Sequence, residues 1–207
     1  VSMHLYEDLA ALDRSTKLLP RIQAQDRVIS TRNLRQGIRS RRGDGSFGEV
    51  VPGTLTVVDP GFLVARGNVA TIEIGVEMKI LAKAMIKQID RVMGDLLKQV
   101  SHFKRGSSDA ICVAVVGINH APYATGYEGN RAFKTDGRAN RHPIQEAADA
   151  TQRLLRDVAP AYDEFVLIHY SATNESPYPF SWVNFAETHA NYGAALVRIS
   201  REYDRRF

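Results

Sequence analysis

Hydrophobic and polar side chains alternate along residues 70–80 of the chain. Successive side chains of a β-strand point to opposite faces, so this alternation predicts a strand with one apolar face. The opposite face then carries two acids and a base in a row. The apolar positions are Ile72, Ile74, Val76, Met78 and Ile80, and the positions between them are Glu73, Gly75, Glu77 and Lys79.

Two shorter apolar segments precede this strand, at residues 54–58 and 62–66. The turn-forming sequence Asp59-Pro60-Gly61 joins them, and Gly67-Asn68 leads into residues 70–80. The pattern predicts a three-stranded antiparallel meander. The glycine-rich segment 43–48, which lies before it, predicts a flexible break.

The rest of the chain alternates between helix and strand patterns. Apolar residues at steps of three and four predict helices, and the continuous apolar run 110–118 predicts a central strand that is covered on both faces. Residues 164–170 predict a further strand. Strands that alternate with helices form parallel crossovers. The sequence therefore predicts an α/β fold with a mixed central sheet, a β-meander plus parallel crossover strands, flanked by helices. The predicted helices are 4–13, 20–39, 81–103, 143–158 and 183–204, and the further strands are 110–118 and 164–170.

Size and composition indicate one ordinary globular domain. The chain has 207 residues, of which 44% are hydrophobic and 24% charged. We expect a single domain over 1–207 with a core at about 20–170, completed by the helix at 183–204. No apolar run approaches the roughly 20 residues of a membrane helix, and no secretory leader pattern opens the chain, so we expect a cytoplasmic protein without a membrane partner. A single cysteine, Cys112, excludes a disulfide within the chain.

The net charge of +4 is unevenly distributed. Residues 14–42 are rich in arginine and contain one acid, Asp26, which favours contact with phosphates or a solvated helix face. The long segment 119–142 interleaves basic and aromatic residues, as in a nucleic-acid contact or a mobile surface loop. The candidate DNA-binding residues are Arg32, Arg35, Arg39, Arg41, Arg42, Lys83, Lys87, Arg131, Lys134, Arg138 and Arg141.

The acids of residues 70–80 suggest a metal site. Carboxylates close together repel each other unless a positive charge lies among them, and Lys79 with a divalent metal would supply that charge. Mg²⁺ takes oxygen ligands, and one or two carboxylates with waters and a phosphate are typical. Asp59 begins the second predicted strand, and strand starts face strand ends in an antiparallel pair, so we expect Asp59 near Glu77. Glu73 is the alternative second acid.

Asp59, then Glu77-Met78-Lys79, then a long helix and an apolar strand resemble the PD-(D/E)xK nuclease superfamily, which includes many type II restriction endonucleases. The family core is helix, three-strand meander, helix, strand, and the resemblance covers residues 20–118. It implies a restriction-endonuclease-like fold in which Asp59 and Glu77 bind Mg²⁺, or Mn²⁺ as a substitute. It also implies that the Met78 carbonyl is a ligand and that Lys79 serves the attacking water. One position departs from the family, because Pro60 follows Asp59 instead of preceding it.

The resemblance further implies an accessory acid, for which Glu49 is the nearby candidate beside Glu73. The expected function is a Mg²⁺-dependent endonuclease that hydrolyses double-stranded DNA as a homodimer. The alternative is a non-catalytic nucleic-acid-binding or assembly domain on the same fold, in which Glu77 and Lys79 form an ordinary ion pair.

Overall fold

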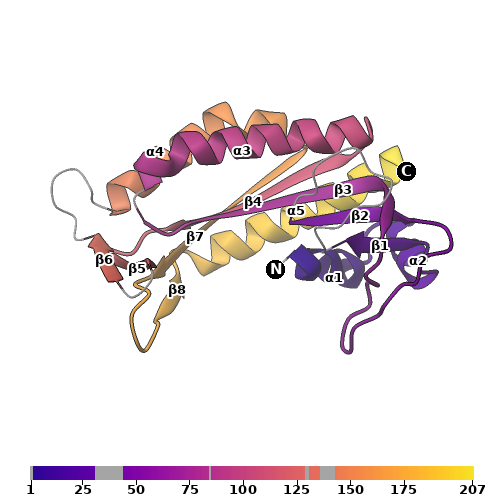
Figure 1. Cartoon of the computed structure of the whole chain (residues 1–207), viewed down its shortest axis with the longest axis horizontal. Helices are drawn as coiled ribbons and strands as arrows, with labels where there is room; N and C mark the ends of the chain where they lie inside the picture. The colour runs from indigo at the N-terminus through magenta and orange to yellow at the C-terminus, as the bar shows by residue number, and fades with distance from the viewer. Residues whose placement is uncertain (1, 31–43, 84, 129–130, 136–142) are drawn as a thin grey trace.

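The computed structural model describes the chain except for residues 1, 31–43, 84, 129–130 and 136–142, and except for the side chains of 127–145 (Figure 1). A six-stranded sheet in the order β1-β2-β3-β4-β7-β8 forms its centre. β1, β2 and β3 pair antiparallel, β3, β4 and β7 pair parallel, and β8 returns antiparallel to β7. The strands are β1 Arg27–Ser30, β2 Gly45–Val50, β3 Val69–Leu81, β4 Ile111–Asn119, β7 Glu164–Ala172 and β8 Phe180–Trp182. The expected mixed α/β sheet, with a meander at one side and parallel strands at the other, is confirmed.

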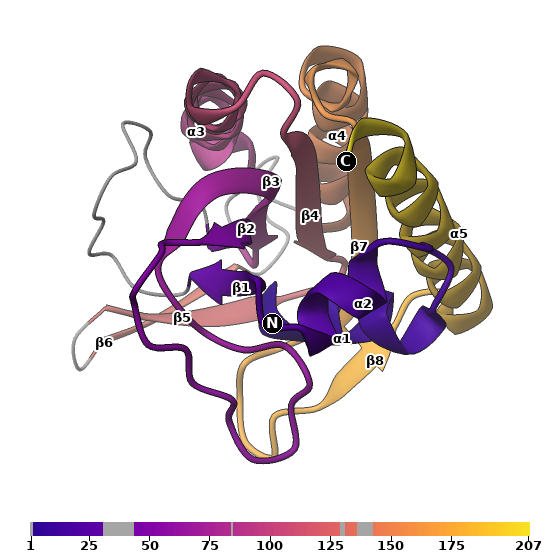
Figure 2. The same cartoon turned by 90° about the vertical axis from the view of Figure 1, so that its right-hand side faces the viewer.

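Helices cover both faces of the sheet (Figures 1 and 2). One core lies between the sheet and the pair α3 (Met85–Gly106) and α4 (Pro143–Asp157). A second core lies on the other face, against α1 (Ser2–Leu12), α2 (Leu18–Gln23) and α5 (Phe185–Arg206). No helix among the described residues is long and apolar enough to cross a membrane.

The central strand β4 explains the two cores. Each of its residues is buried, and alternate side chains enter opposite cores: Cys112 and Ala114 face α3 and α4, whereas Val113 and Val115 face the other helices. The continuous apolar run from Ile111 to Ile118 suits this central place.

The segment after β4 contains a small hairpin. β5 (Ala124–Glu128) pairs antiparallel with β6 (Arg131–Thr135) in a separate two-stranded sheet. A short 3-10 helix, η1 (Ala159–Ala161), joins α4 to β7. The hairpin lies at the end of the main sheet where β3, β4 and β7 finish (Figure 1).

The meander is built from other residues than expected. The predicted strands 54–58 and 62–66 are wrong, because residues 51–68 form a loop with only isolated bridges, Val57 to Arg66 and Ile29 to Arg66. The predicted helix 20–39 is also wrong beyond α2, since β1 begins at Arg27, and residues 31–39 lie outside the described part.

Adjacent side chains in β1 show why a helix does not form there. Val28 packs into the core under α3, and Ile29 packs into the core on the opposite face. Neighbouring residues reach opposite faces in a strand but not in a helix. β2 likewise replaces the flexible break expected at 43–48, and its first four residues are buried.

Candidate active site

The candidate site lies where β3 outlasts its neighbour β2. Pairing between the two strands ends at Gly45 and Val76, whereas pairing with β4 continues to Leu81 and Ile118. Residues 77–81 of β3 therefore have no strand partner on the β2 side within the described part of the chain. We call this side of residues 77–81 the open edge of β3.

Glu77 and Lys79 share one face of β3, as the alternation predicts. The Glu77 Oε1 and Lys79 Nζ atoms are 2.6 Å apart, and the side chains are 9% and 28% exposed. Both point to the side covered by α3. Burial, with the nearby charge of Glu77, raises the pKa of Tyr162, whose hydroxyl donates to the Leu96 carbonyl of α3. The Glu77–Lys79 pair is therefore partly covered by α3, and the Lys79 side chain is the more exposed of the two.

Asp44 is the acid that the structure brings to this pair. It directly precedes β2, and its Oδ2 atom accepts a hydrogen bond of 2.7 Å from the Met78 N–H. The N–H and C=O groups of one strand residue point to the same side of the strand, so the Met78 carbonyl also faces the open edge. Gly45 pairs with Val76, so one more step of the same register sets Asp44 opposite Glu77. Directly opposed residues of two strands have their side chains on the same face.

Glu73 does not lie in a row with Glu77 and Lys79, because β3 contains a bulge. Phe47 pairs with Ile74, but the next residue, Gly48, pairs with Ile72, so Glu73 is the extra residue. Ile72 packs into the core under α3, whereas Ile74 packs into the opposite core. A Cβ on Gly48 would lie 1.9 Å from the Thr71 carbonyl oxygen, so the close approach needs glycine.

Glu73 is instead a structural acid under α5. Its carboxylate accepts hydrogen bonds from Arg27 Nε at 2.6 Å and from the Tyr203 hydroxyl at 2.5 Å. Arg21 adds an ionic contact at 3.9 Å. The residue is buried, and its charge is balanced on the face opposite Glu77. The expectation that Glu73 serves as the second metal acid is wrong.

Asp59 is not brought to Glu77. It lies in the 51–68 loop, where Arg66 donates two hydrogen bonds to its carboxylate and lowers its pKa. Arg66 bridges to Ile29 of β1 and lies three residues before β3 begins at Val69. Glu77 lies eight residues beyond Val69, or about 26 Å further along the strand at 3.3 Å per residue. Asp59 therefore stabilises the loop instead of joining a metal site with Glu77.

Glu49 is also remote from the open edge. It lies in β2, exposed, opposite Thr71, whose hydroxyl is 3.5 Å from its carboxylate. Thr71 precedes Glu77 by six residues along β3, or about 20 Å at 3.3 Å per residue.

The donors at the open edge fit Mg²⁺ better than a softer metal. Two carboxylates, of Asp44 and Glu77, and one carbonyl are oxygen donors, and Mg²⁺ commonly adds waters and phosphate to such a partial set. The hydrogen bond from Met78 uses one oxygen of Asp44, and a carboxylate has a second. Among the residues that the structure describes, no three His, Cys, Asp or Glu side chains form a metal cage.

Two of the predicted DNA-binding side chains are described. Lys87 is exposed near the start of α3, and the Lys83 ammonium lies against Gly126 of β5. Another acid that the sequence did not indicate is Glu146, which is buried on α4 and accepts a hydrogen bond of 2.7 Å from the Met85 N–H at the start of α3. The side chains of the other candidates lie outside the described part; they are Arg32, Arg35, Arg39, Arg41, Arg42, Arg131, Lys134, Arg138 and Arg141.

Comparison with known proteins gives no relative. No family model, no curated protein and no solved structure matches the chain. The functional argument therefore depends on the geometry at the open edge of β3.

Proposed function

We propose that this protein is a Mg²⁺-dependent endonuclease of the PD-(D/E)xK type that hydrolyses phosphodiester bonds of DNA. One observation supports this most strongly: Asp44, at the start of β2, bonds to the strand that carries the Glu77–Lys79 pair. In this proposal the two acids, the Met78 carbonyl and Lys79 act together at the open edge of β3.

The order of elements supports the same proposal. α2, the meander β1-β2-β3, α3 and β4 follow one another as helix, three strands, helix and strand. This is the order of the PD-(D/E)xK core, but the second acid becomes Asp44 instead of Asp59. A restriction-endonuclease-like fold is the finer description that we propose for this sheet.

Each residue has a distinct role in the proposed reaction. Asp44, Glu77 and the Met78 carbonyl would hold Mg²⁺, which when bound polarises the phosphoryl oxygen and lowers the pKa of a bound water. The Lys79 ammonium donates hydrogen bonds to the attacking water and offsets negative charge that develops on the phosphate. Glu77 holds this ammonium at 2.6 Å on the α3 side of the strand, where the Lys79 side chain is 28% exposed. Cutting both strands of a duplex takes two such sites, which supports a homodimer.

The alternative is a nucleic-acid-binding domain without catalysis. Glu77 is largely covered and paired with Lys79, while Asp44 bonds to backbone. Glu77 and Lys79 could therefore form a purely structural ion pair, and a pair of this kind adds little stability when it is exposed to solvent.

Plasmid cleavage with Mg²⁺ or Mn²⁺ tests the proposal. We expect the wild type to nick or cut the plasmid, and Asp44→Asn, Glu77→Gln and Lys79→Met to lower the rate by at least about 100-fold, because each removes a group that acts on the transition state. Asp59→Asn is the matched control for Asp44→Asn and should retain full activity. Cleavage that survives in Glu77→Gln would refute the site. Binding of DNA without cleavage by the wild type would favour the alternative.

A further inference from the structure

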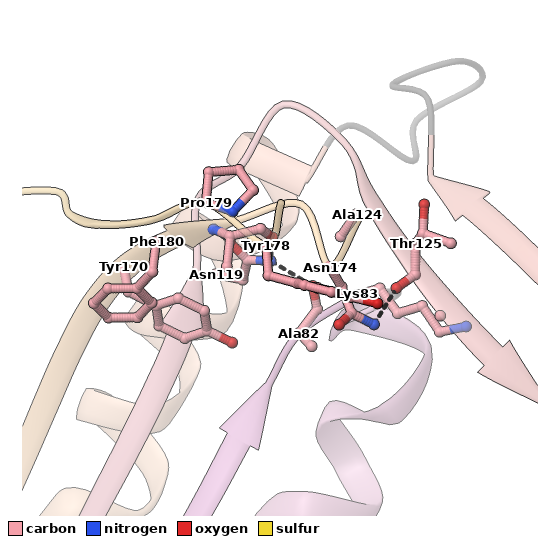
Figure 3. A pocket seen from close by; sticks show the side chains of 12 residues that line it. Ala82, Lys83, Asn119, Ala124, Thr125, Tyr170, Asn174, Tyr178, Pro179 and Phe180 are labelled. Atoms are coloured by element: carbon pink, nitrogen blue, oxygen red, sulfur yellow. Dashed lines mark hydrogen bonds between the residues drawn. The ribbon is translucent and has the colours of Figure 1, made fainter. Parts of the chain in front are cut away.

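A cavity of about 350 Å³ opens where the parallel strands end (Figure 3). Ala82 follows β3, Asn119 ends β4 and Ala172 ends β7, and all three line it. β5 and the segment 174–180 supply its other walls. Ligands of open α/β sheets bind outside the carboxyl ends of the parallel strands, which is the position of this cavity.

Hydrogen bonds make the frame of the cavity rigid. The Asn119 amide nitrogen donates to the carbonyls of Ala82 and Ala172, and its oxygen accepts from the N–H groups of Ala121 and Ala172. One side chain thus joins the ends of three parallel strands. These bonds use the amide fully, so it is not available to read a ligand.

Two polar side chains on the β5 side also bond within the frame of the cavity. The Asn174 amide donates to the Thr125 carbonyl at 2.8 Å, and the Thr125 hydroxyl donates to Glu175 at 2.5 Å. These side chains are therefore held by the frame of the cavity. The cavity also presents aromatic ring faces and a positive charge.

Aromatic rings form one wall of the cavity. Tyr170 and Phe180 stack with centroids 5.7 Å apart and planes 16° from parallel. Phe180 is 57% exposed although it is apolar, and Tyr178 beside it is 65% exposed. Tyr170 is buried at 9% exposure, so Phe180 presents the accessible face of this stack. An exposed ring that lines a cavity suits a flat ligand, because an aromatic face can bind another π-system.

Lys83 supplies positive charge beside these rings. It lines the cavity, and a Cβ on Gly126 would lie 2.0 Å from its Nζ atom, so this glycine leaves room for the ammonium. Lys83 follows Lys79 by four residues, two of them beyond the end of β3, so their Cα atoms lie within about 14 Å of each other.

We infer that this cavity takes an unpaired base of the DNA strand that enters the proposed nuclease site, with the base on the Tyr170–Phe180 stack and its phosphate at Lys83. The inference depends on the proposed function for its choice of partner. Because the base would bind mainly through its ring face, binding should tolerate any base, as in other stacking platforms. The volume lies within the range of small-molecule sites.

The single tryptophan gives a direct readout, because Trp182 contacts Phe180 edge-on at a centroid distance of 5.0 Å. Titration of the full chain with a single-stranded thymidine oligonucleotide in EDTA, where no metal supports hydrolysis, should change Trp182 fluorescence. Phe180→Ala should weaken binding by about 5- to 150-fold, the loss of one stacked base. Phe185→Ala is the matched control, since Phe185 is 64% exposed and does not line the cavity, and its affinity should stay within about twofold.

Affinity for each variant is best followed with a dye-labelled oligonucleotide, so that the variants do not alter the reporter. An abasic oligonucleotide of equal length keeps the phosphates and should bind the wild type about as weakly as the normal strand binds Phe180→Ala. Equal affinity for both oligonucleotides, or no effect of Phe180→Ala, would overturn the inference. A change of oligomeric state in Phe180→Ala without loss of affinity would also overturn it, and would assign the rings to a second copy of the chain. If the wild type does not cleave DNA but binds the oligonucleotide as described, only the proposed nuclease function is refuted.

Discussion

Replacing Glu73 by glutamine should destabilise the fold without touching the proposed metal site. Glu73 is 4% exposed, and its carboxylate holds Arg27 at 2.6 Å, Tyr203 at 2.5 Å and Arg21 at 3.9 Å. Removing one partner of a fully buried ion pair costs about 3–5 kcal/mol, and the partners of Glu73 are mostly covered, with 15% of the Arg27 side chain exposed. Glutamine retains an acceptor for Tyr203, so we expect a loss near the lower limit, about 3 kcal/mol.

This loss is large enough to measure by thermal or urea unfolding. At this chain length 1 kcal/mol corresponds to about 2–4 °C in Tm, so Glu73→Gln should lower Tm by about 6–12 °C. Glu49→Gln is the matched control, since Glu49 is exposed and makes only a contact of 3.5 Å to Thr71; its effect should stay within about 0.5 kcal/mol. Equal stability of the two variants would refute the bulge and its ion-pair network. Loss of Mn²⁺ binding in Glu73→Gln, with stability retained, would return Glu73 to the metal site.

Two further predictions concern titratable groups in the folded chain. Burial, with Asp163 nearby, raises the pKa of Cys112 to about 12, so iodoacetamide at pH 8 should label the native thiol far more slowly than the urea-unfolded one; equal rates would contradict its burial. Burial lowers the pKa of both His120 and His169, whose rings lie 4.7 Å apart. As the pH falls below about 6.5, these two histidines take up protons in the unfolded chain before they do so in the folded chain. The free energy of unfolding should therefore decrease as the pH falls. Urea unfolding at pH 7.5 and 5.5 should show a smaller loss of stability in a variant with both histidines replaced by asparagine than in the wild type. An equal loss in both proteins would refute the role of His120 and His169 in this pH dependence.

The long amphipathic elements could be predicted from the sequence because their patterns are regular and tertiary packing agrees with them. The stripe predicted for residues 81–103 is the buried side of α3, from Met85 to Phe103. β4, α4, β7 and α5 were found within a few residues for the same reason. Each of these helices buries one apolar stripe, and each of these strands packs against the core, and hydrophobic periodicity along a sequence reflects such burial.

The N-terminal meander could not be predicted, because β1 and β2 are short and the loop 51–68 has a strand-like sequence pattern. β1 has four residues and β2 begins with glycine and serine. The loop 51–68, by contrast, contains β-branched and aliphatic residues that remain exposed, such as Leu55 at 91% and Val57 at 52%. Sequence patterns predict a residue's preference for burial, but exposure depends on what the rest of the chain covers.

The site was predicted in part. Alternation was enough to put Glu77 and Lys79 on one face, because no irregularity separates them. It failed at Glu73, where a bulge depends on the partner strand, although Gly48 within a strand is a known sign of one. Asp44 was missed for a related reason: its position opposite β3 follows from the start of β2, which the sequence did not reveal.

Locating Mn²⁺ by anomalous diffraction from crystals grown with a DNA oligonucleotide tests the central claim most directly. We predict a peak at the open edge of β3, with oxygen ligands from Asp44, Glu77 and the Met78 carbonyl at about 2.1–2.2 Å. Soaked Glu77→Gln crystals should lack that peak. A peak beside Asp59, or ordered DNA at the sheet without a metal at Glu77, would contradict the account.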